Sequence, residues 1–258
     1  MVIGVCFKIL PDFEDVDPVD WEYPQQLDFG FVKKIYGCFD EAALETALRL
    51  RDQLTAAGIE VRTVAVTVGA PESAAAEGLL RSLFAAGYDD VVTIPGSAGF
   101  DPRHTAKVLA GYFLENPADV IFCGRMAGPG DSGMVPMHLA RELGYGLYPE
   151  LTTAVWDTAV NAMVVTCREG NVLRRRQVAG KAVCTLGDAE AAYLRLFPLR
   201  ARMAARNREF TPFQGIVQEN TPEVILLSEK KETVPCHFLS RDTAARQLLD
   251  ILKGADEA

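Results

Sequence analysis

The sequence has no long hydrophobic run, and its apolar residues are spread along the whole chain. No apolar stretch approaches the ~20 residues that a membrane-spanning helix needs. The chain begins MVIGVCFKILPDFEDVDP, which lacks the charged start, the long apolar core and the small-residue cleavage site of a signal peptide. We therefore expect a cytoplasmic protein with no membrane insertion.

The sequence is also poor in positive charge and in groups that bind zinc. It has 26 Lys and Arg against 35 Asp and Glu, a net charge of −9, which argues against a nucleic-acid partner because such proteins need a basic face. No two of the 6 cysteines form a CxxC pair, and the 3 histidines are scattered. Four cysteines lie in apolar strand-like runs, where we expect buried free thiols: Cys6, Cys123, Cys167 and Cys184.

Several catalytic signatures are missing. The sequence has no P-loop lysine, so a kinase or an ATPase is a poor interpretation. No glycine-rich SGGxDS loop follows the first predicted strand, which counts against an adenylate-forming or ATP-splitting enzyme. No local signature of a Ser/His/Asp or Cys/His nucleophile is present either.

The first 145 residues contain an alternation of strand and helix patterns. Predicted strands cover residues 1–7, 60–69, 89–96 and 119–123, and predicted helices cover residues 39–58, 72–87, 101–115 and 137–144. Asp40 and Asp101 are expected to cap their helices, with Pro102 at a first helical position. Strands rich in Val and Ile between amphipathic helices indicate a parallel sheet with helices on both faces. Such sheets bind ligands at the carboxyl ends of their strands.

The pattern changes after residue 150. Residues 152–187 are predicted to form antiparallel strands, with turns near residues 157–161 and 169–171. Residues 194–213 mix basic and apolar side chains. The tail has one predicted strand at residues 223–228 and one predicted helix at residues 241–253. Residues 12–31 form an acidic and aromatic insert, interpreted as a loop or a short hairpin.

One glycine-rich loop, CGRMAGPGDSGMVP at residues 123–136, follows a predicted strand and precedes a predicted helix. Glycines let a backbone approach a ligand closely, and a helix start offers N–H groups and a partial positive charge. The combination suits a phosphate, and Asp131 and Ser132 could cap the helix or bond a ribose or phosphate group. A plain strand-to-helix turn is the alternative interpretation.

The order of four stretches resembles the beta subunit of electron transfer flavoproteins, a family that includes the FixA proteins. The stretches are VCFKILPD, FDEAALETALRL, EVRTVAVTVGAPESAAAEGLLRSLFAAGYDDVV and ADVIFCGRMAGPGDSGMVPMHLARELG. The resemblance implies an α/β, Rossmann-like fold of the adenine nucleotide alpha hydrolase type. It spans roughly residues 1–210, which we expect to form the nucleotide-binding domain. Residues 211–258 resemble the family's C-terminal arm.

The resemblance also implies a function. Such a subunit is an electron carrier rather than an enzyme, and it holds AMP, or a second FAD in electron-bifurcating members. With an alpha subunit it forms the site of a shared FAD, which carries electrons from an acyl-CoA-type or other flavin dehydrogenase to an acceptor. Carried over position by position, the implied cofactor-binding residues are Cys6, Lys8, Gly37, Phe39, Asp40, Val68, Arg125, Ala127, Gly128, Gly130, Asp131, Ser132, Gly133, Met134 and Val135.

A dehydrogenase-docking segment is implied at residues 186–210. Its expected docking residues are Leu196 and Phe197 as apolar anchors, with Arg200 and Arg202 beside them. A solvated helix face is the alternative for the arginines, and residues 188–191 look helical. Without its alpha subunit the chain could form a homodimer.

The glycine-rich loop departs from the family pattern, and this keeps a second function open. Pro129 stands at an acidic position of the family, and Met134 at a glutamine. These replacements leave AMP, FAD and no nucleotide as alternatives. They also leave open a nucleotide-binding or regulatory module that has lost the redox role.

Overall fold

The computed structural model describes residues 1–16, 32–69, 73–95, 101–128, 130–214, 244–246 and 248–249. The chain divides into two compact units, Met1–Pro222 and Glu223–Ala258. The described residues of the second unit are helical, and they lie within the predicted helix at residues 241–253. The domain boundary expected near residue 210 stays a prediction.

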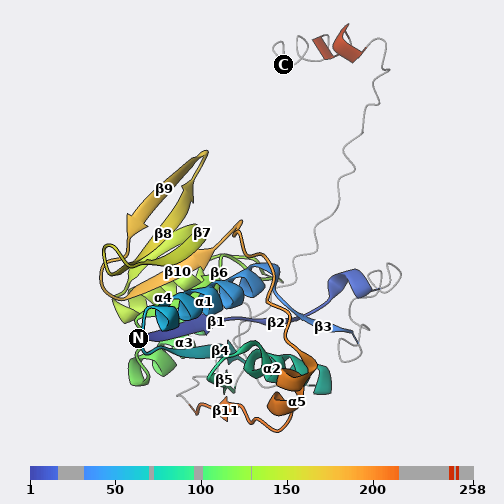
Figure 1. The fold of residues 1–258 in the computed structure, drawn as a ribbon. Helices are drawn as coiled ribbons and strands as arrows, with labels where there is room; N and C mark the ends of the chain where they lie inside the picture. The colour runs from blue at the N-terminus through green and yellow to red at the C-terminus, as the bar shows by residue number, and fades with distance from the viewer. Residues whose placement is uncertain are drawn as a thin grey trace. The chain divides into compact units, whose positions relative to one another are not determined.

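A single large sheet organises the first unit, as Figure 1 shows. Its strand order is β11-β5-β4-β1-β6-β10-β7-β8-β9. The strands are β1 (Val2–Cys6), β4 (Arg62–Val68), β5 (Asp90–Ile94), β6 (Val120–Gly124), β7 (Gly146–Asp157), β8 (Ala162–Glu169), β9 (Val172–Gln177), β10 (Ala182–Leu186) and β11 (Thr211–Pro212). Neighbours from β11 to β7 pair in parallel, and β7, β8 and β9 pair antiparallel. The predicted α/β fold with a parallel sheet and added antiparallel strands is confirmed.

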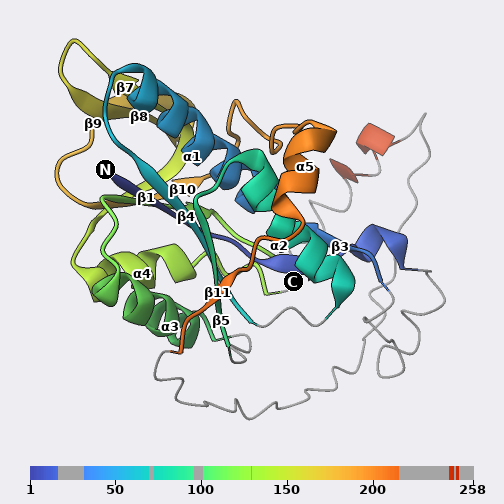
Figure 2. The same ribbon diagram turned by 60° about the horizontal axis from the view of Figure 1, so that its bottom comes forward.

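Helices cover both faces of this sheet (Figure 2). The helices are α1 (Cys38–Ala56), α2 (Ala74–Ala86), α3 (Pro102–Glu115), α4 (Val135–Leu143) and α5 (Leu199–Ala205). One apolar cluster contains residues of α1 and α2, and the other contains residues of α3 and α4. Successive residues of β4 divide between them, because Ala65 belongs to the first cluster and Val64 and Val66 belong to the second.

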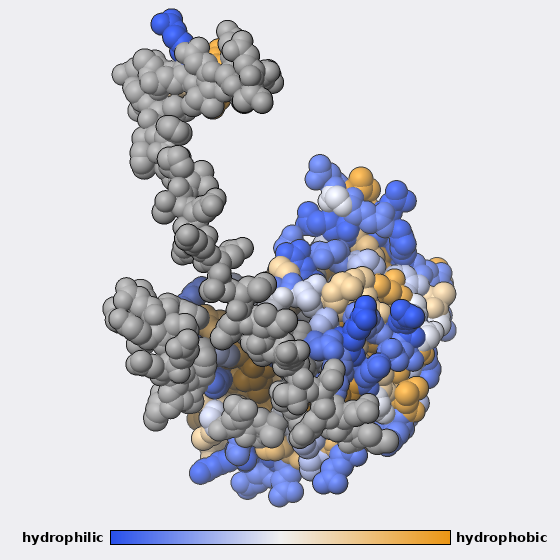
Figure 3. All heavy atoms as spheres, turned by 180° about the vertical axis from the view of Figure 1, so that it is seen from behind, coloured by the Kyte–Doolittle hydropathy of each residue, from blue (hydrophilic) through white to orange (hydrophobic). Residues whose placement is uncertain are grey.

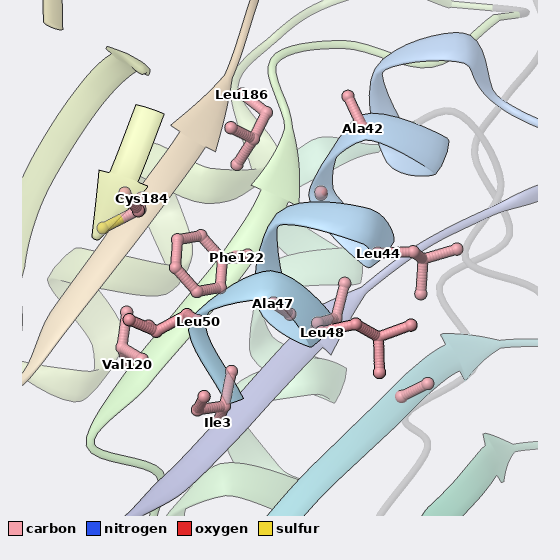
Figure 4. Packing of buried hydrophobic residues seen from close by; sticks show 14 of the residues in the cluster. Ile3, Ala42, Leu44, Ala47, Leu48, Leu50, Val120, Phe122, Cys184 and Leu186 are labelled. Carbon is pink, nitrogen blue, oxygen red and sulfur yellow. The ribbon is translucent and has the colours of Figure 1, made fainter. Parts of the chain in front are cut away.

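The core under α1 illustrates the packing (Figure 4). Leu44 and Leu48 of α1 are fully buried, as are Ile3 of β1 and Phe122 of β6. These side chains share one cluster with Cys184 of β10. Helix α1 therefore packs over β1, β6 and β10, the strands at the centre of the sheet.

Local sequence signals explain most helix boundaries. The Ser73 hydroxyl accepts from Ala76 N–H and caps α2, and Gly87 ends that helix in the left-handed region. Asp101 caps α3 by accepting from Arg103 N–H, and Pro102 starts the helix. The predicted capping role of Asp40 is wrong: the N-cap of α1 is Gly37, and Asp40 lies within the first turn.

The C-terminal half corrects two further predictions. The predicted turns at residues 157–161 and 169–171 do connect β7, β8 and β9. However, β10 was expected among the antiparallel strands and instead pairs in parallel with β6 and β7. Its five residues, AVCTL, are all buried, which is typical of a strand covered on both faces. Residues 188–191 are not helical.

A short hairpin flanks the acidic insert. Strand β2 (Ile9–Pro11) pairs antiparallel with β3 (Lys34–Tyr36), and a short 3-10 helix, η1 (Phe13–Asp15), follows β2. Residues 17–31 of the insert and the predicted strand at residues 223–228 lie outside the described residues. Among the residues that are described, no helix has both the length and the apolar character needed to cross a membrane.

Candidate functional site

A cavity lies at the carboxyl ends of β1, β4 and β6, where the sheet meets the first turns of α3 and α4. This is the edge at which parallel α/β sheets bind ligands. The lining residues come from the ends of these strands, from α1, α3 and α4, and from the glycine-rich loop: Cys6, Phe7, Lys8, Asp40, Val68, Pro102, Thr105, Leu109, Cys123, Gly124, Arg125, Met126, Ala127, Gly130, Asp131, Ser132, Gly133, Val135 and Pro136.

Most of the predicted cofactor-binding residues line this one cavity. They are Cys6, Lys8, Asp40, Val68, Arg125, Ala127, Gly130, Asp131, Ser132, Gly133 and Val135. Four others lie beside it instead of in its wall: Gly37 and Phe39 at the start of α1, Gly128 in the loop, and Met134 at the N-cap of α4. The tertiary structure thus brings together residues that are far apart in the sequence.

Asp40 is buried at the base of the cavity. Its Oδ2 accepts from Lys8 N–H at 3.0 Å, and its Oδ1 accepts from Gly124 N–H at 3.2 Å. Burial raises the pKa of Asp40 to about 7, although these two hydrogen bonds and the Lys8 ammonium act in the opposite direction. The carboxyl is therefore poised between its two protonation states near neutral pH.

Two glycines make room for this carboxyl. A Cβ on Gly124 would lie 2.4 Å from Asp40 Oδ1 and 2.8 Å from Asp40 N. A Cβ on Gly37 would lie 2.9 Å from Asp40 Oδ2. Helix α1 approaches the ends of β1 and β6 this closely because neither glycine carries a side chain.

The glycine-rich loop uses left-handed backbone at three neighbouring positions. Gly130, Asp131 and Gly133 have φ values of 107°, 33° and 63°. Glycine adopts such angles without strain, and aspartate tolerates them better than most residues. The loop can therefore fold tightly around the mouth of the cavity.

The loop caps α4 differently from the prediction. The N-cap residue is Met134, so neither Asp131 nor Ser132 is the cap. The Ser132 hydroxyl instead accepts from Met134 N–H at 3.3 Å, just before the helix begins. Pro136 removes one first-turn donor, which leaves the N–H groups of Val135 and Met137 at the start of α4.

Arg125 lines both this cavity and a second one beside it. Its guanidinium lies over the Phe39 ring, with Cζ 4.5 Å from the ring centroid, and its Nη1 lies 3.4 Å from Glu150 Oε2. Glu150 and Thr185 line the second cavity together with Arg125. Within the described part of the chain, Arg125 Nε is buried without a hydrogen-bond partner, so the guanidinium retains a donor.

Lys8 and two thiols complete the base of the site. Burial lowers the pKa of Lys8, against the opposing effect of Asp40 and Asp131. Cys6 and Cys123 are register partners on β1 and β6, and a hydrogen bond between them together with burial raises the pKa of Cys6 well above its usual value. The predicted burial of Cys6, Cys123, Cys167 and Cys184 as free thiols is confirmed.

Sequence reasoning missed the wall that α3 supplies. Pro102, Thr105 and Leu109 line the cavity, yet α3 follows β5, which is two strands away from β1 in the sheet. A signal was present, because every strand-to-helix connection of a parallel sheet opens on the same edge. The remaining missed residues are near neighbours of predicted ones: Phe7, Cys123, Gly124, Met126 and Pro136.

The predicted docking residues divide into two groups. Leu196 is 100% exposed, and Arg200 and Arg202 are also exposed. Phe197 is half-buried and packs against the core, and its ring centroid lies 5.4 Å from Arg202 Cζ. The exposed apolar residues around Leu196 are instead Tyr193, Leu199 and Met203.

Arg195 fastens this segment to α1. Its Nε and Nη2 donate to Glu45, its backbone N–H donates to Glu45 Oε2 at 2.9 Å, and its Nη1 donates to Asp52 at 2.6 Å. The Glu45 side chain is only 5% exposed. The sequence showed a basic segment but not this buried acidic partner 150 residues earlier.

Comparison with known proteins identifies the family. A model of the electron transfer flavoprotein domain matches residues 35–213. The acryloyl-CoA reductase electron transfer subunit gamma of Anaerotignum propionicum is 34% identical over 149 residues, which are 55% of this chain and 52% of that protein. The electron transfer flavoprotein subunit beta of Megasphaera elsdenii is 32% identical over 182 residues, 66% of this chain and 62% of that protein.

Protein FixA of Azotobacter vinelandii is 33% identical over 178 residues, 65% of this chain and 59% of that protein. The chain thus spans between about half and three-fifths of the length of these three relatives. The matched domain covers more than half of the chain, including the glycine-rich loop and the docking segment. The chain therefore belongs to the electron transfer flavoprotein family and is similar to proteins named as its subunit beta and as FixA.

Proposed function

We propose that this chain is the beta-type subunit of an electron transfer flavoprotein and that its cavity binds AMP or a second FAD. With an alpha subunit it would form the site of a shared FAD, which passes electrons from a dehydrogenase to an acceptor. The observation that carries the proposal is that most of the residues implied by the family resemblance line one cavity.

The chemistry of the cavity suits an adenine nucleotide. The Lys8 ammonium, the Arg125 guanidinium and the first N–H groups of α4 are donors for a phosphate. Val68 and Leu109 supply apolar wall for a base or a ribose carbon. The Ser132 hydroxyl can bond a ribose or phosphate oxygen.

The flavin would supply the redox chemistry, and the chain would bind and orient it. The described residues include no cluster of three or more His, Cys, Asp or Glu side chains suited to a metal. We assign this chain three tasks: to hold a nucleotide, to form one side of the shared FAD site and to dock the electron donor.

Docking is proposed for the surface around Leu196. Tyr193, Leu196, Leu199 and Met203 are at least 62% exposed, and Arg200 and Arg202 are exposed beside them. Apolar anchors with neighbouring arginines are typical of the centre of a protein interface. A flavin dehydrogenase, of the acyl-CoA type or another, is the partner that the family resemblance favours.

The test is to purify the chain with and without an alpha subunit encoded beside it, denature it, and identify any released nucleotide by chromatography and absorbance. AMP would support a carrier with one flavin, and FAD released from the chain alone would support a bifurcating type. If neither preparation releases a nucleotide, the cofactor proposal is wrong.

A second function would then gain support. The replacements at Pro129 and Met134 remove polar groups from the loop and favour a regulatory module that has lost the redox role. Such a module would not reconstitute electron transfer in the alpha–beta pair, whether or not it binds a nucleotide. Reduction of a dye acceptor by the reconstituted pair separates the two functions.

A further inference from the structure

The two carboxylate oxygens of Asp40 bond the ends of two different strands. Oδ2 accepts from Lys8 N–H, two residues beyond β1, and Oδ1 accepts from Gly124 N–H, the last residue of β6. Lys8, Gly124 and Asp40 all line the cavity. One buried side chain of α1 thus fixes the point at which two walls of the cavity begin.

The backbone around Asp40 reinforces this link. Gly37 N–H donates to Lys8 carbonyl oxygen at 3.3 Å, and Glu41 N–H donates to Gly37 carbonyl oxygen at 2.8 Å. The start of α1 is therefore bonded to the end of β1 by both backbone and side chain. The absence of a Cβ at Gly37 and Gly124 lets the carboxylate lie between the two strand ends.

We propose that Asp40 is a positioning residue of the nucleotide site, which acts by holding the Lys8 segment and the start of the glycine-rich loop in fixed relation. Gly124 leads directly into that loop at Arg125, so a shift at Gly124 displaces the phosphate-facing donors as a group. The inference rests on the nucleotide-binding function proposed above and assigns to Asp40 a role exerted through backbone groups.

The surroundings make the link sensitive to protonation. The ionisable and charged groups that face Asp40 or share its cavity are Lys8 and Cys6 at the end of β1, Cys123 and Arg125 at the end of β6, and Asp131 in the loop. A carboxylate accepts at both oxygens, whereas in a protonated carboxyl one oxygen carries the proton and is a weaker acceptor. Protonation therefore weakens at least one of the two backbone hydrogen bonds.

The first test follows the backbone amide proton resonances of Lys8 and Gly124 in the full chain as pH is varied. We expect both resonances to move together, with one midpoint near pH 7, and to stay fixed in Asp40→Asn. Asp101→Asn is the matched control, because asparagine also caps helices well and Asp101 bonds Arg103 N–H at the start of α3 instead. In that control the two resonances should titrate as in the wild type.

The second test measures AMP affinity by calorimetry on the same three proteins. The side-chain amide introduced by Asp40→Asn would present an N–H group to one of the two backbone donors, so we expect this variant to bind AMP roughly tenfold more weakly. Asp101→Asn should bind AMP as the wild type does. Independent or absent titration of the two wild-type resonances, or unchanged AMP affinity in Asp40→Asn, would overturn the inference. If the wild-type chain binds no AMP, the nucleotide proposal is wrong. The titration of the Lys8 and Gly124 resonances in the wild type needs no ligand, so it still decides whether Asp40 links the two strand ends.

Discussion

At the scale of single residues, Asp40 should give the folded chain a distinctive pH dependence. Burial raises the pKa of Asp40 to about 7, whereas an unfolded aspartate titrates near its ordinary value of about 3.9. Between these values the folded state holds the proton more tightly. The free energy of unfolding should therefore fall as pH rises from about 4 to about 7, by at most about 4 kcal/mol from this group.

Urea denaturation of the wild type and of Asp40→Asn between about pH 5 and about pH 8 measures this contribution. The wild type should lose stability relative to the variant as pH rises, because asparagine does not titrate. A constant difference between the two proteins would mean that Asp40 ionises in the folded state as easily as in the unfolded one.

Gly124 should tolerate no side chain. A Cβ there would lie 2.4 Å from Asp40 Oδ1 and 2.9 Å from the Phe39 carbonyl carbon, and the latter belongs to the backbone. We expect Gly124→Ala to lower the free energy of unfolding by about 1–3 kcal/mol. Gly111→Ala is the control, since nothing lies within 4 Å of the Cβ that alanine would add in α3, and alanine there should stabilise by about 0.5–1 kcal/mol. Chemical denaturation measures the free energy of unfolding of both variants, which should fall in Gly124→Ala and rise in Gly111→Ala.

At the scale of elements, an ion-pair cluster attaches the segment proposed for docking to α1. Arg195→Ala would leave Glu45, which is 5% exposed, with Arg49 as its remaining ion-pair partner. We expect a loss of about 1–3 kcal/mol in stability, less than for a fully buried pair because Arg195 is 28% exposed. Arg195→Lys should show part of this loss of stability, because an ammonium cannot reproduce the forked contact with Glu45.

Arg174→Ala provides the comparison for that cluster. Arg174 and Glu169 form a pair whose side chains are 59% and 41% exposed, so its loss should change stability by less than about 1 kcal/mol. Hydrogen exchange of the backbone at residues 193–198 should rise in Arg195→Ala and stay unchanged in Arg174→Ala. Equal exchange in both variants would show that Arg195 does not hold the segment.

Leu196 and Phe197 are neighbours that should behave differently. Leu196 is 100% exposed, so Leu196→Ser should change the free energy of unfolding by less than about 0.5 kcal/mol. Phe197 packs against the core, and Phe197→Ala should cost about 2–3 kcal/mol. If Leu196 docks a dehydrogenase, its substitution should slow electron transfer from that enzyme without unfolding the chain, as measured by flavin reduction kinetics.

At the scale of the whole molecule, a bound nucleotide should stabilise the first unit. At a concentration about 100 times its dissociation constant, AMP should add about 2.7 kcal/mol to the free energy of unfolding and raise the Tm by roughly 5–10 °C. Inorganic phosphate is the control, because it offers the phosphate contacts without the base and ribose. A thermal shift of the same size with phosphate would argue for an anion site that does not recognise the nucleotide.

Seen from behind, most described surface residues are hydrophilic, and the hydrophobic ones lie in separate small groups (Figure 3). Tyr193, Leu196, Leu199 and Met203 are exposed apolar residues within one short segment. That arrangement favours a limited contact over a broad apolar interface at this site.

Much of the fold could be predicted because the local signals agree with one another. Asp101 with Pro102 and the closing glycine of α2 set helix boundaries that the structure confirms. The prediction failed where a local pattern had two solutions. Asp40 has the sequence position of a cap but bonds two strand ends, and β10 follows a hairpin but is buried as a parallel strand. In both cases contacts across the sheet outweighed the local preference.

The sequence by itself determined the alternation of strands and helices, the parallel sheet, the glycine-rich loop at a strand end and the family. These follow from periodicity, capping residues and motif order, which are properties of neighbouring residues. Only the tertiary structure decided that Asp40 joins β1 to β6, that α3 supplies a cavity wall, and that Glu45 holds Arg195. Each of these is a contact between segments distant in the chain, and its geometry and burial are fixed only when the whole sheet and its helices pack together.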